Sequence, residues 1–386
     1  MRDVDASTYE SREKLIAAIR VILNSSGYVS VDFPLMESTE LFVRKSGGDI
    51  SGRLYSFTDP GGNKVSLRPE FTSSVIRSYI DQNIDASSVR RVQYSGPVFR
   101  YSGQGSRDGL RQFTQQGCEV IGSSGLKTDA EVLSLAIASV AASGLEKITI
   151  KLGNLGMIRS ILEGEGISEA LMAFTLANLD FITNPEGSID SVVENATKLG
   201  LVTDESGNKD NKTNYGEESI ELIQYLMSDT LSGNTGIRTK EEIVTRLIRK
   251  YSDETTSSDY RDSLNVLNEF FLTMVGNVSD IEINPDSPAY ISEAYSYVNN
   301  LIDSVHSPNL DVQYKVDFGS SRGLTYYSGL IFDIEYREKN ETVPIGGGGR
   351  YDGLVRSLGG QSDVPAIGFA INIDTLLDVV SEVQPE

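Results

Sequence analysis

Arginine, carboxylate and tyrosine side chains stand beside glycines and prolines in a few short segments of this chain. The clearest is SRGLTYYSGLIFDIEY, residues 321–336, in which Arg322 precedes the pair Tyr326 and Tyr327. Arginine is a planar cation that grips a carboxylate or a phosphate. In an extended backbone the two tyrosines point to opposite faces, so one can line a pocket while the other packs beneath it. The segment suits a small zwitterionic ligand, and the alternative is an edge strand with a surface arginine.

Two other segments supply acids and neutral polar groups. LRPEFT, residues 67–72, contains Glu70 and Thr72, and RQFTQQGCE contains Gln115 and Glu119. The alternation of Gln115 and Glu119 places both on one face of a strand. Glutamates accept hydrogen bonds from an ammonium group, and the glutamine adds a neutral donor and acceptor. These groups complement a free amino acid, although each segment alone also fits a buried ion pair at a strand end.

Arginine also occurs beside glycine in VFRYSG and in PIGGGGRYDGL, residues 344–354. Arg100 in the first segment can hold a carboxylate or a phosphate, as Arg322 can. In the second, the glycine run before Arg350 lets the backbone approach a ligand closely. The run lacks the GxxxxGK[ST] pattern of a P-loop and the GxGxxG spacing of a dinucleotide fingerprint, so neither kind of site is predicted.

The charge of the chain is strongly acidic. Its 386 residues include 34 basic and 55 acidic side chains, a net charge of −21. A nucleic-acid-binding protein normally carries a basic footprint, and this overall field repels polyanions. The balance therefore counts against RNA or DNA as the main partner, while a local basic groove, or an acidic load that serves solubility, stays open. With no long apolar run and no secretory signal, we expect a cytoplasmic protein.

Metal and thiol chemistry have few residues to use. The chain has one cysteine, Cys118, and one histidine, His306, in the polar stretch SVHSPN. A single cysteine excludes an internal disulfide and a CxxC metal framework. We expect His306 to be a solvated loop residue, and we expect neither a metal nor a cofactor.

The order of periodic segments predicts an α+β architecture. Helical spacing appears at 8–26, 73–82 and 128–144, a hairpin pattern surrounds DPGG, and strand patterns occur in RRVQYSGPVFRYSG, LRQFTQQGCEVIG and ITIKLGN. From about 155 to 305 helical periodicity dominates, and the polar stretch 203–219 is expected to be flexible. Strand patterns return after it, so residues 1–155 and 305–386 are predicted to form one core, interrupted by a mainly helical insertion at 156–304.

These segments resemble the catalytic core of the histidyl-tRNA synthetases, which are class II aminoacyl-tRNA synthetases. FPLMESTELF, with Pro34, resembles the family's first motif, a dimer-interface element, and LRPEFT resembles its LRPEGT segment. The stretch from YSGPVFRYSG to LRQFTQQGCEVIG resembles the second motif. RGLTYYSG resembles the histidine-specific RGLDYYTG loop, and GGGGRYDGL resembles AGGRYDGL. The resemblance implies an antiparallel sheet flanked by helices, with a helical insertion, in a homodimer.

The resemblance also implies a histidine pocket. Its residues would be Glu70, Thr72, Arg100, Gln115, Glu119, Arg322, Tyr326 and Tyr327, with Gly349 and Arg350 as possible neighbours. The acids would receive the amino group and the imidazole, and the arginines would receive the carboxylate. In the family, the positions of Arg100 and Arg322 also face the α-phosphate during adenylation.

Several positions depart from the family pattern. Ser102 replaces a glutamate of the second motif, whose loop is SGQGSRDG with only Arg107, and Thr325 replaces an acid of the histidine loop. Thr375 stands where the third motif has an arginine over the adenine ring. The chain ends at residue 386, soon after GFAIN, with no anticodon-binding domain. Losing a preorganised cation at a reacting phosphate costs several kcal/mol of transition-state stabilisation.

The departures are similar to those of the regulatory subunits of short-form ATP phosphoribosyltransferases. That resemblance implies a non-catalytic regulatory subunit in the first step of histidine biosynthesis, with no catalytic residues, which binds histidine for feedback control. The expected partners are the catalytic phosphoribosyltransferase subunit, a second copy of the chain and histidine, and tRNA is not expected. Two alternatives remain: a histidine--tRNA ligase that activates histidine with ATP, or another synthetase-derived amino-acid sensor.

Overall fold

The computed structural model describes most of the chain. The described residues are 3–43, 52–85, 88–101, 111–183, 187–203, 255–307, 310–319, 326–338 and 341–383. Several predictions lie outside them: the loop 103–109, nearly all of the stretch 203–219, and the positions of Ser102, Thr325 and Arg322.

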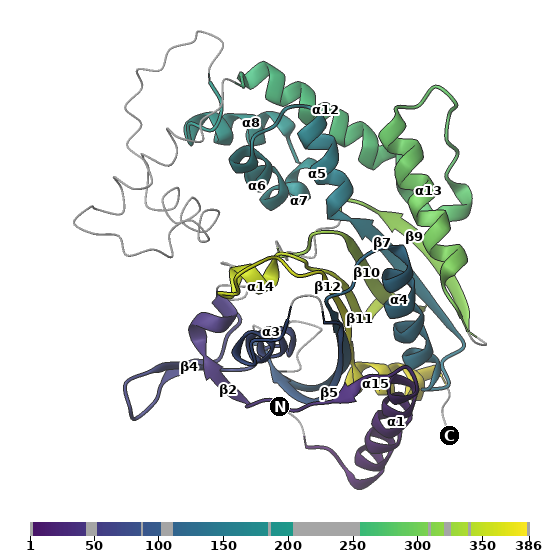
Figure 1. Cartoon of the computed structure of the whole chain (residues 1–386). Coiled ribbons are helices and arrows are strands. Elements are labelled where there is room, and N and C mark those ends of the chain that lie inside the picture. The colour runs from purple at the N-terminus through teal and green to yellow at the C-terminus, as the bar shows by residue number, and fades with distance from the viewer. Residues whose placement is uncertain are drawn as a thin grey trace.

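A nine-stranded sheet forms the centre of the molecule (Figure 1), in the order β1-β5-β6-β12-β11-β10-β7-β9-β8. The six strands from β5 to β7 pair antiparallel, whereas β1 with β5 and β7 with β9 pair parallel. The strands are β1 Val29–Ser30, β5 Arg90–Phe99, β6 Gln112–Ile121, β7 Lys147–Asn154, β8 Val275–Asn277, β9 Asp311–Asp317, β10 Leu330–Glu338, β11 Glu341–Arg350 and β12 Ala366–Asn372.

The predicted α+β class is confirmed, and the sheet is mixed rather than purely antiparallel. The difference arises at the outer strands. Between β7 and β9 the chain passes through a block of helices, and such a long crossover lets a strand return in the same direction as the one it pairs with. The predicted antiparallel arrangement holds for the six central strands, which carry most of the predicted site.

The predicted hairpin lies in a small separate sheet of order β2-β4-β3. These strands are β2 Met36–Ser38, β3 Ser56–Thr58 and β4 Lys64–Leu67. The Asp59 carboxylate accepts a hydrogen bond from the backbone N–H of Asn63 at 2.8 Å and so closes the turn. The stretch around Pro34 was expected to be one strand but divides into β1 and β2, because proline has no N–H to give to a ladder.

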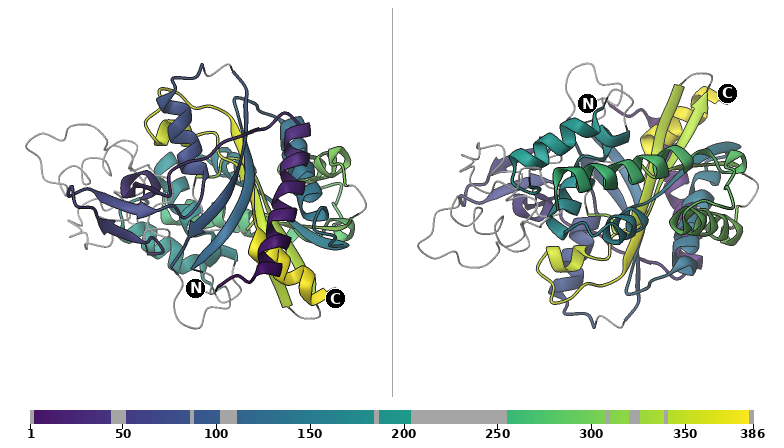
Figure 2. Two further views of the ribbon diagram at one scale, coloured as in Figure 1. Left: turned by 90° about the horizontal axis from the view of Figure 1, so that it is seen from below. Right: turned by 90° about the horizontal axis from the view of Figure 1, so that it is seen from above.

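Helices cover both faces of the large sheet (Figures 1 and 2). The helices α1 Ala6–Ser25, α4 Leu126–Ala141, α13 Ala289–Ser304 and α15 Ile373–Val383 lie on one face. The other face carries α3 Thr72–Asp81, α14 Leu354–Ser357 and the small sheet. The helices expected at 8–26, 73–82 and 128–144 correspond to α1, α3 and α4.

Between β7 and β9 the described elements are mostly helices: α5 Leu155–Gly164, α6 Glu169–Ala177, α7 Leu179–Thr183, α8 Ile189–Lys198, α12 Ser257–Thr273 and α13. They bury residues such as Leu171, Phe174 and Tyr260. One short strand also occurs there, because β8 pairs antiparallel with β9 at the edge of the sheet. Among the described helices, none has the length and apolar character needed to cross a membrane.

Candidate functional site

Strand alternation and register gather the predicted site on the sheet face that α3 covers. Gln115 and Glu119 lie four residues apart on β6, with Gly117 between them. The register places Tyr94 of β5 opposite Gly117, and Gly368 of β12 opposite Glu119. Residues directly opposite in paired strands share a face. The site is therefore built on three neighbouring strands of the central antiparallel part.

The centre of the site is the carboxylate of Glu119, which is only 1% exposed. Its Oε1 accepts hydrogen bonds from the Thr72 hydroxyl at 2.7 Å and from the Tyr94 hydroxyl at 3.0 Å. Its Oε2 accepts a hydrogen bond from the hydroxyl of Tyr351, which follows β11. Burial and the Glu119 charge raise the pKa of Tyr94 and of Tyr351 well above its ordinary value, so both tyrosines remain protonated donors.

Stacked side chains hold Tyr94 in this place. Its ring lies parallel to that of Phe71, with centroids 4.4 Å apart. The guanidinium carbon of Arg68 lies 4.0 Å from the centre of the Phe71 ring on its own account. Arg68 is 1% exposed and donates to the carbonyls of Phe33 and Pro97, at 2.7 and 2.9 Å. The LRPEFT segment is thus anchored by Arg68, which leaves Glu70 and Thr72 at the site.

Glu70 lies at the start of α3 and is 8% exposed. Its carboxylate accepts hydrogen bonds from the backbone N–H of Ser73, at 3.2 and 3.3 Å, and from the Ser73 hydroxyl. A carboxylate in this position satisfies a free N–H group of the first helical turn and complements the helix dipole. Its charge also contributes to the raised pKa of Tyr94, which places the two acids Glu70 and Glu119 around one tyrosine.

Gln115 is the predicted site residue with an unused group. It is 7% exposed, and its side-chain oxygen Oε1 makes no hydrogen bond within the part of the chain that the structure describes. The register sets Gln115 between Gly96 of β5 and Asn372 of β12. A buried amide oxygen without a donor costs free energy unless a ligand or a water molecule supplies one.

Arg100 follows β5 and lies over the same region. Its Nε donates to the carbonyl of Pro69 at 2.9 Å, and its guanidinium carbon lies 5.3 Å from the centre of the Phe113 ring. The backbone bond fixes the direction of the guanidinium and joins it to the segment that carries Glu70 and Thr72.

The tyrosine pair lies beside Tyr351. The ring centroids of Tyr326 and Tyr327 are 4.5 Å apart, and Tyr326 meets Tyr351 edge-on at 6.2 Å. Tyr327 is buried against Gly349, where a Cβ atom would come within 2.8 Å of the tyrosine ring. The two tyrosines therefore divide as expected, because Tyr326 lies beside a donor to Glu119 while Tyr327 packs on the sheet.

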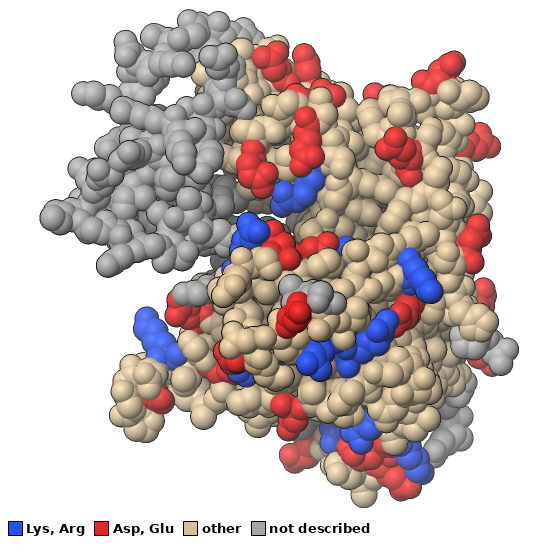
Figure 3. All heavy atoms as spheres, in the orientation of Figure 1, with Lys and Arg blue, Asp and Glu red and all other residues tan. Residues whose placement is uncertain are grey.

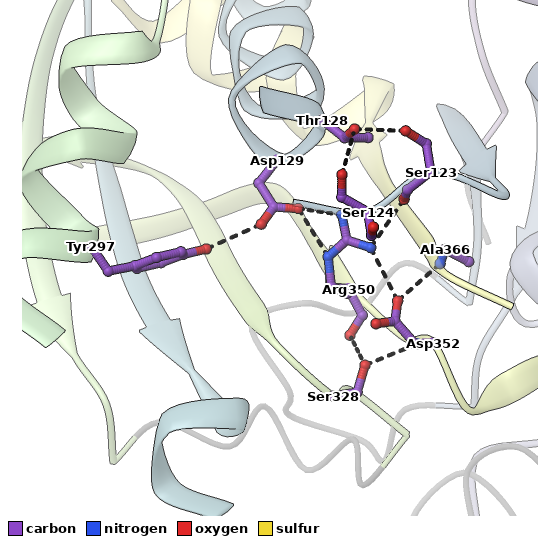
Figure 4. Close-up of polar contacts among 9 residues, drawn as sticks. All are labelled: Ser123, Ser124, Thr128, Asp129, Tyr297, Ser328, Arg350, Asp352 and Ala366. Atoms are coloured by element: carbon purple, nitrogen blue, oxygen red, sulfur yellow. Dashed lines mark hydrogen bonds and ion pairs between the residues drawn. The ribbon is translucent and has the colours of Figure 1, made fainter. Parts of the chain in front are cut away.

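Arg350 extends to the other side of the sheet. Its side chain pairs with Asp129 of α4, at N–O distances of 2.5 and 3.0 Å (Figure 4). Gly349 faces Tyr327, and the next residue along a strand points the opposite way. Of the ten predicted site residues, Arg322 lies outside the described part of the chain, and Arg350 is directed away from Glu119.

Two residues of the site, Tyr94 and Tyr351, were not among those predicted. Both donate to Glu119. Tyr94 shares the alternation of its strand and could have been found by pairing YSG with QGCE. Tyr351 directly follows the arginine that drew attention in GGGGRYDGL.

Other potential sites are sparse. No group of three or more His, Cys, Asp or Glu side chains suited to a metal occurs within the described ranges. His306 is exposed, as expected. On the face shown in Figure 3, acidic and basic side chains are interspersed, and the surface is indented between the helical block at the top and the body below.

Comparison with known proteins gives a consistent family. The family model described as histidyl-tRNA synthetase matches residues 1–181 and 245–376. A histidine--tRNA ligase from Sulfolobus acidocaldarius is 31% identical over 371 residues, covering 95% of this chain and 70% of that protein. A solved structure of a histidine--tRNA ligase subunit from Alicyclobacillus acidocaldarius has a TM-score of 0.57 at 23% identity, covering 100% of this chain and 97% of that one.

These relatives overturn the expectation of a regulatory subunit. Proteins that are 29 to 31% identical over nearly the whole chain carry the name histidine--tRNA ligase. A solved structure from Bacillus halodurans is described as an ATP phosphoribosyltransferase regulatory subunit/histidyl-tRNA synthetase, but at 20% identity, with a TM-score of 0.57 over 98% of this chain and 81% of that one, it supports the fold alone.

The expected partner, a catalytic phosphoribosyltransferase subunit, and the expected absence of tRNA are wrong for the same reason. The physical error lay in the use of net charge, because a sum over all residues does not fix the charge of the one surface that meets a ligand. With both sequence blocks matched by the family model, the chain belongs to the histidyl-tRNA synthetase family.

Proposed function

We propose that this chain is a histidine--tRNA ligase that binds histidine at Glu119, activates it with ATP and transfers it to tRNA. The observation that carries the proposal is the buried Glu119 carboxylate, which is surrounded by hydroxyl donors and aromatic rings. The relatives that carry the ligase name support it.

The depth of Glu119 suits the imidazole of histidine. An imidazole N–H can donate to the carboxylate, and this bond is stronger than a neutral one because the acceptor is charged. Tyr326 and Tyr351 supply aromatic surface beside it. A side chain without an N–H or O–H donor would leave the buried acid without that bond, and sites of this kind reject such analogues strongly.

The other groups suit the main-chain end of an amino acid. The Gln115 oxygen and the Glu70 carboxylate can accept hydrogen bonds from the ammonium group. Arg100 can hold the carboxylate and, with Arg322, the α-phosphate of ATP, as the family resemblance implies. These assignments use acids for the cationic end of the ligand and arginines for the anionic end.

The proposed activation step is a displacement at phosphorus. An oxygen of the histidine carboxylate attacks the α-phosphorus of ATP, the bond from that phosphorus to the bridging oxygen breaks, and pyrophosphate leaves. Histidyl adenylate is the other product. The arginines would stabilise the charge that develops on the phosphoryl oxygens.

Histidine-dependent exchange of pyrophosphate into ATP tests the proposal. We expect exchange with histidine, none with other amino acids, and charging of tRNA. The matched pair Glu119→Gln and Glu131→Gln removes a carboxylate that accepts a tyrosine hydroxyl bond in each case, but only the first lies at the site. A folded protein that binds histidine without exchange would refute ligase activity and favour an amino-acid sensor.

A further inference from the structure

We propose that the ion pair between Arg350 and Asp129 is a positioning device for the amino-acid site, an inference that rests on the proposed histidine site. It would hold Tyr351 at Glu119 and the Tyr326–Tyr327 segment beside it. Arg350 and Asp129 touch neither Glu119 nor its three hydroxyl donors in the bonds described above, so they would act through Tyr351.

The pair is buried and closed. The side chains of Arg350 and Asp129 are 8% and 6% exposed, and Nε and one terminal nitrogen of Arg350 both donate to Oδ1 of Asp129. The other oxygen, Oδ2, accepts a hydrogen bond from the Tyr297 hydroxyl of α13 at 3.2 Å (Figure 4). A buried charge needs this degree of pairing, and removing one partner leaves the other uncompensated.

The same guanidinium fixes the residues on both sides of Tyr351. Its remaining terminal nitrogen donates to the Ser123 carbonyl at 3.2 Å and to the Asp352 carboxylate at 3.1 Å. That carboxylate accepts the backbone N–H of Ala366 at 2.9 Å, and the N–H of Tyr351 donates to the Ala366 carbonyl at 2.8 Å. Tyr351 therefore stands between two anchored neighbours.

Ser328 ties the tyrosine pair to this anchor. Its backbone N–H donates to the Arg350 carbonyl at 2.8 Å, and its hydroxyl oxygen accepts the backbone N–H of Asp352 at 2.9 Å. Ser328 directly follows Tyr327. The stem of Arg350 lies on Gly329, where a Cβ atom would come within 3.0 Å of the arginine Cδ. Tyr326, Tyr327 and Tyr351 are thus placed by one connected set of bonds.

Positional accuracy is what such a set supplies. The hydrogen bond from Tyr351 to Glu119 depends on distance and direction, and a shift on the order of 1 Å at a binding group can reduce activity by about 100-fold. Groups of a site keep their geometry when the shell behind them is locked by packing and hydrogen bonds. Because α13 contributes Tyr297, the device also joins a helix from the block between β7 and β9 to the site.

The chain contains a matched control on the same helix. Two residues after Asp129, Glu131 of α4 pairs with Arg91 of β5 at 3.0 and 3.1 Å and accepts the Tyr28 hydroxyl at 3.1 Å. This second set has the same composition, an arginine, an acid and a tyrosine. None of its printed bonds reaches a residue next to the site.

The experiment compares Arg350→Lys with Arg91→Lys, and Tyr297→Phe with Tyr28→Phe, by calorimetry with histidine. Lysine keeps the charge but loses the fork, so we expect histidine affinity to fall about tenfold in Arg350→Lys. We expect Tyr297→Phe to weaken histidine in the same direction, and the two control variants to stay within about twofold of the parent. If Arg350→Lys fails to fold, the Tyr297→Phe comparison decides the outcome.

Amide hydrogen exchange supplies a readout that separates the two proposals. We expect faster exchange of the peptides covering 326–330 and 351–366 in Arg350→Lys and not in Arg91→Lys. A parent protein that binds no histidine would refute the proposed function, while this exchange would still report on the device. A folded Arg350→Lys variant with parental histidine affinity, or with parental exchange in these peptides, would overturn the positioning role.

Discussion

Replacing Glu119 with glutamine tests the site with the smallest change in shape. The carboxylate accepts two hydroxyl bonds on Oε1 and one on Oε2. The amide keeps one oxygen acceptor and puts a donor nitrogen in place of the other. A hydroxyl facing that nitrogen can turn to accept a bond, so the free energy of unfolding should fall by only about 1 kcal/mol, the net worth of one hydrogen bond.

The effect on histidine binding should be larger. A hydrogen bond from an imidazole N–H to a carboxylate is worth about 1.5–3 kcal/mol, because the acceptor is charged. At about 1.4 kcal/mol for each factor of ten, Kd for histidine should rise roughly 10- to 150-fold. The effect on binding should therefore exceed the effect on unfolding.

Calorimetric titration with histidine measures the first quantity, and thermal or denaturant unfolding measures the second. Glu131→Gln is the matched control, because Glu131 also accepts bonds from a tyrosine and an arginine but lies on α4. A folded Glu119→Gln variant with parental affinity for histidine would show that the ligand does not use this acid, and the site would have to be sought elsewhere.

Three further predictions concern the floor of the site, the third motif and the buried tyrosines. In Gly368→Ala the new Cβ would lie 1.5 Å from Oε2 of Glu119, so we expect loss of histidine binding by calorimetry and a lower unfolding temperature, whereas Gly164→Ala, where nothing lies within 4 Å, should bind normally; normal binding in both would contradict the geometry. Thr375→Arg restores the arginine that the family places over adenine, and we expect ATP–pyrophosphate exchange to rise about tenfold or more; an unchanged rate would show that adenine is held by other groups. In an alkaline titration followed by phenolate absorbance, the two tyrosines that donate to Glu119 should stay silent until the protein unfolds, because their pKa is raised in the folded state. Their contribution to stability is complete below the ordinary tyrosine pKa of about 10 and is lost at higher pH, and ionisation of all 18 tyrosines in the folded protein would contradict this expectation.

The polar face of β6 could be predicted because alternation is a local property. Gln115 and Glu119 were placed on one face from their spacing alone, and the structure has both on the face that α3 covers. Tyr94 was missed because its place depends on the register between β5 and β6, which sets it opposite Gly117. Register is decided by packing over the whole strand pair, and a motif of a few residues does not contain it.

Arg350 shows the complementary difficulty. An arginine after a glycine run has the composition of an anion site, yet it lies one position from the face that meets Tyr327. Its partner Asp129 is more than two hundred residues away in the chain. The function was misjudged for a different reason: single departures such as Thr375 weighed more than the likeness along the whole chain, which the comparisons measure.

The glycines of the central strands have a thermodynamic consequence. Gly117, Gly349 and Gly368 each lie under a site side chain, namely Tyr94, Tyr327 and Glu119. A glycine in a strand is less favourable than alanine by about 0.5–1 kcal/mol, so three of them lower stability by roughly 2–3 kcal/mol. A ligand at about 100 times its Kd stabilises the folded state by about 2.7 kcal/mol. Occupancy and heat resistance are therefore linked in this protein: the supply of its substrate would help decide how much of it stays folded.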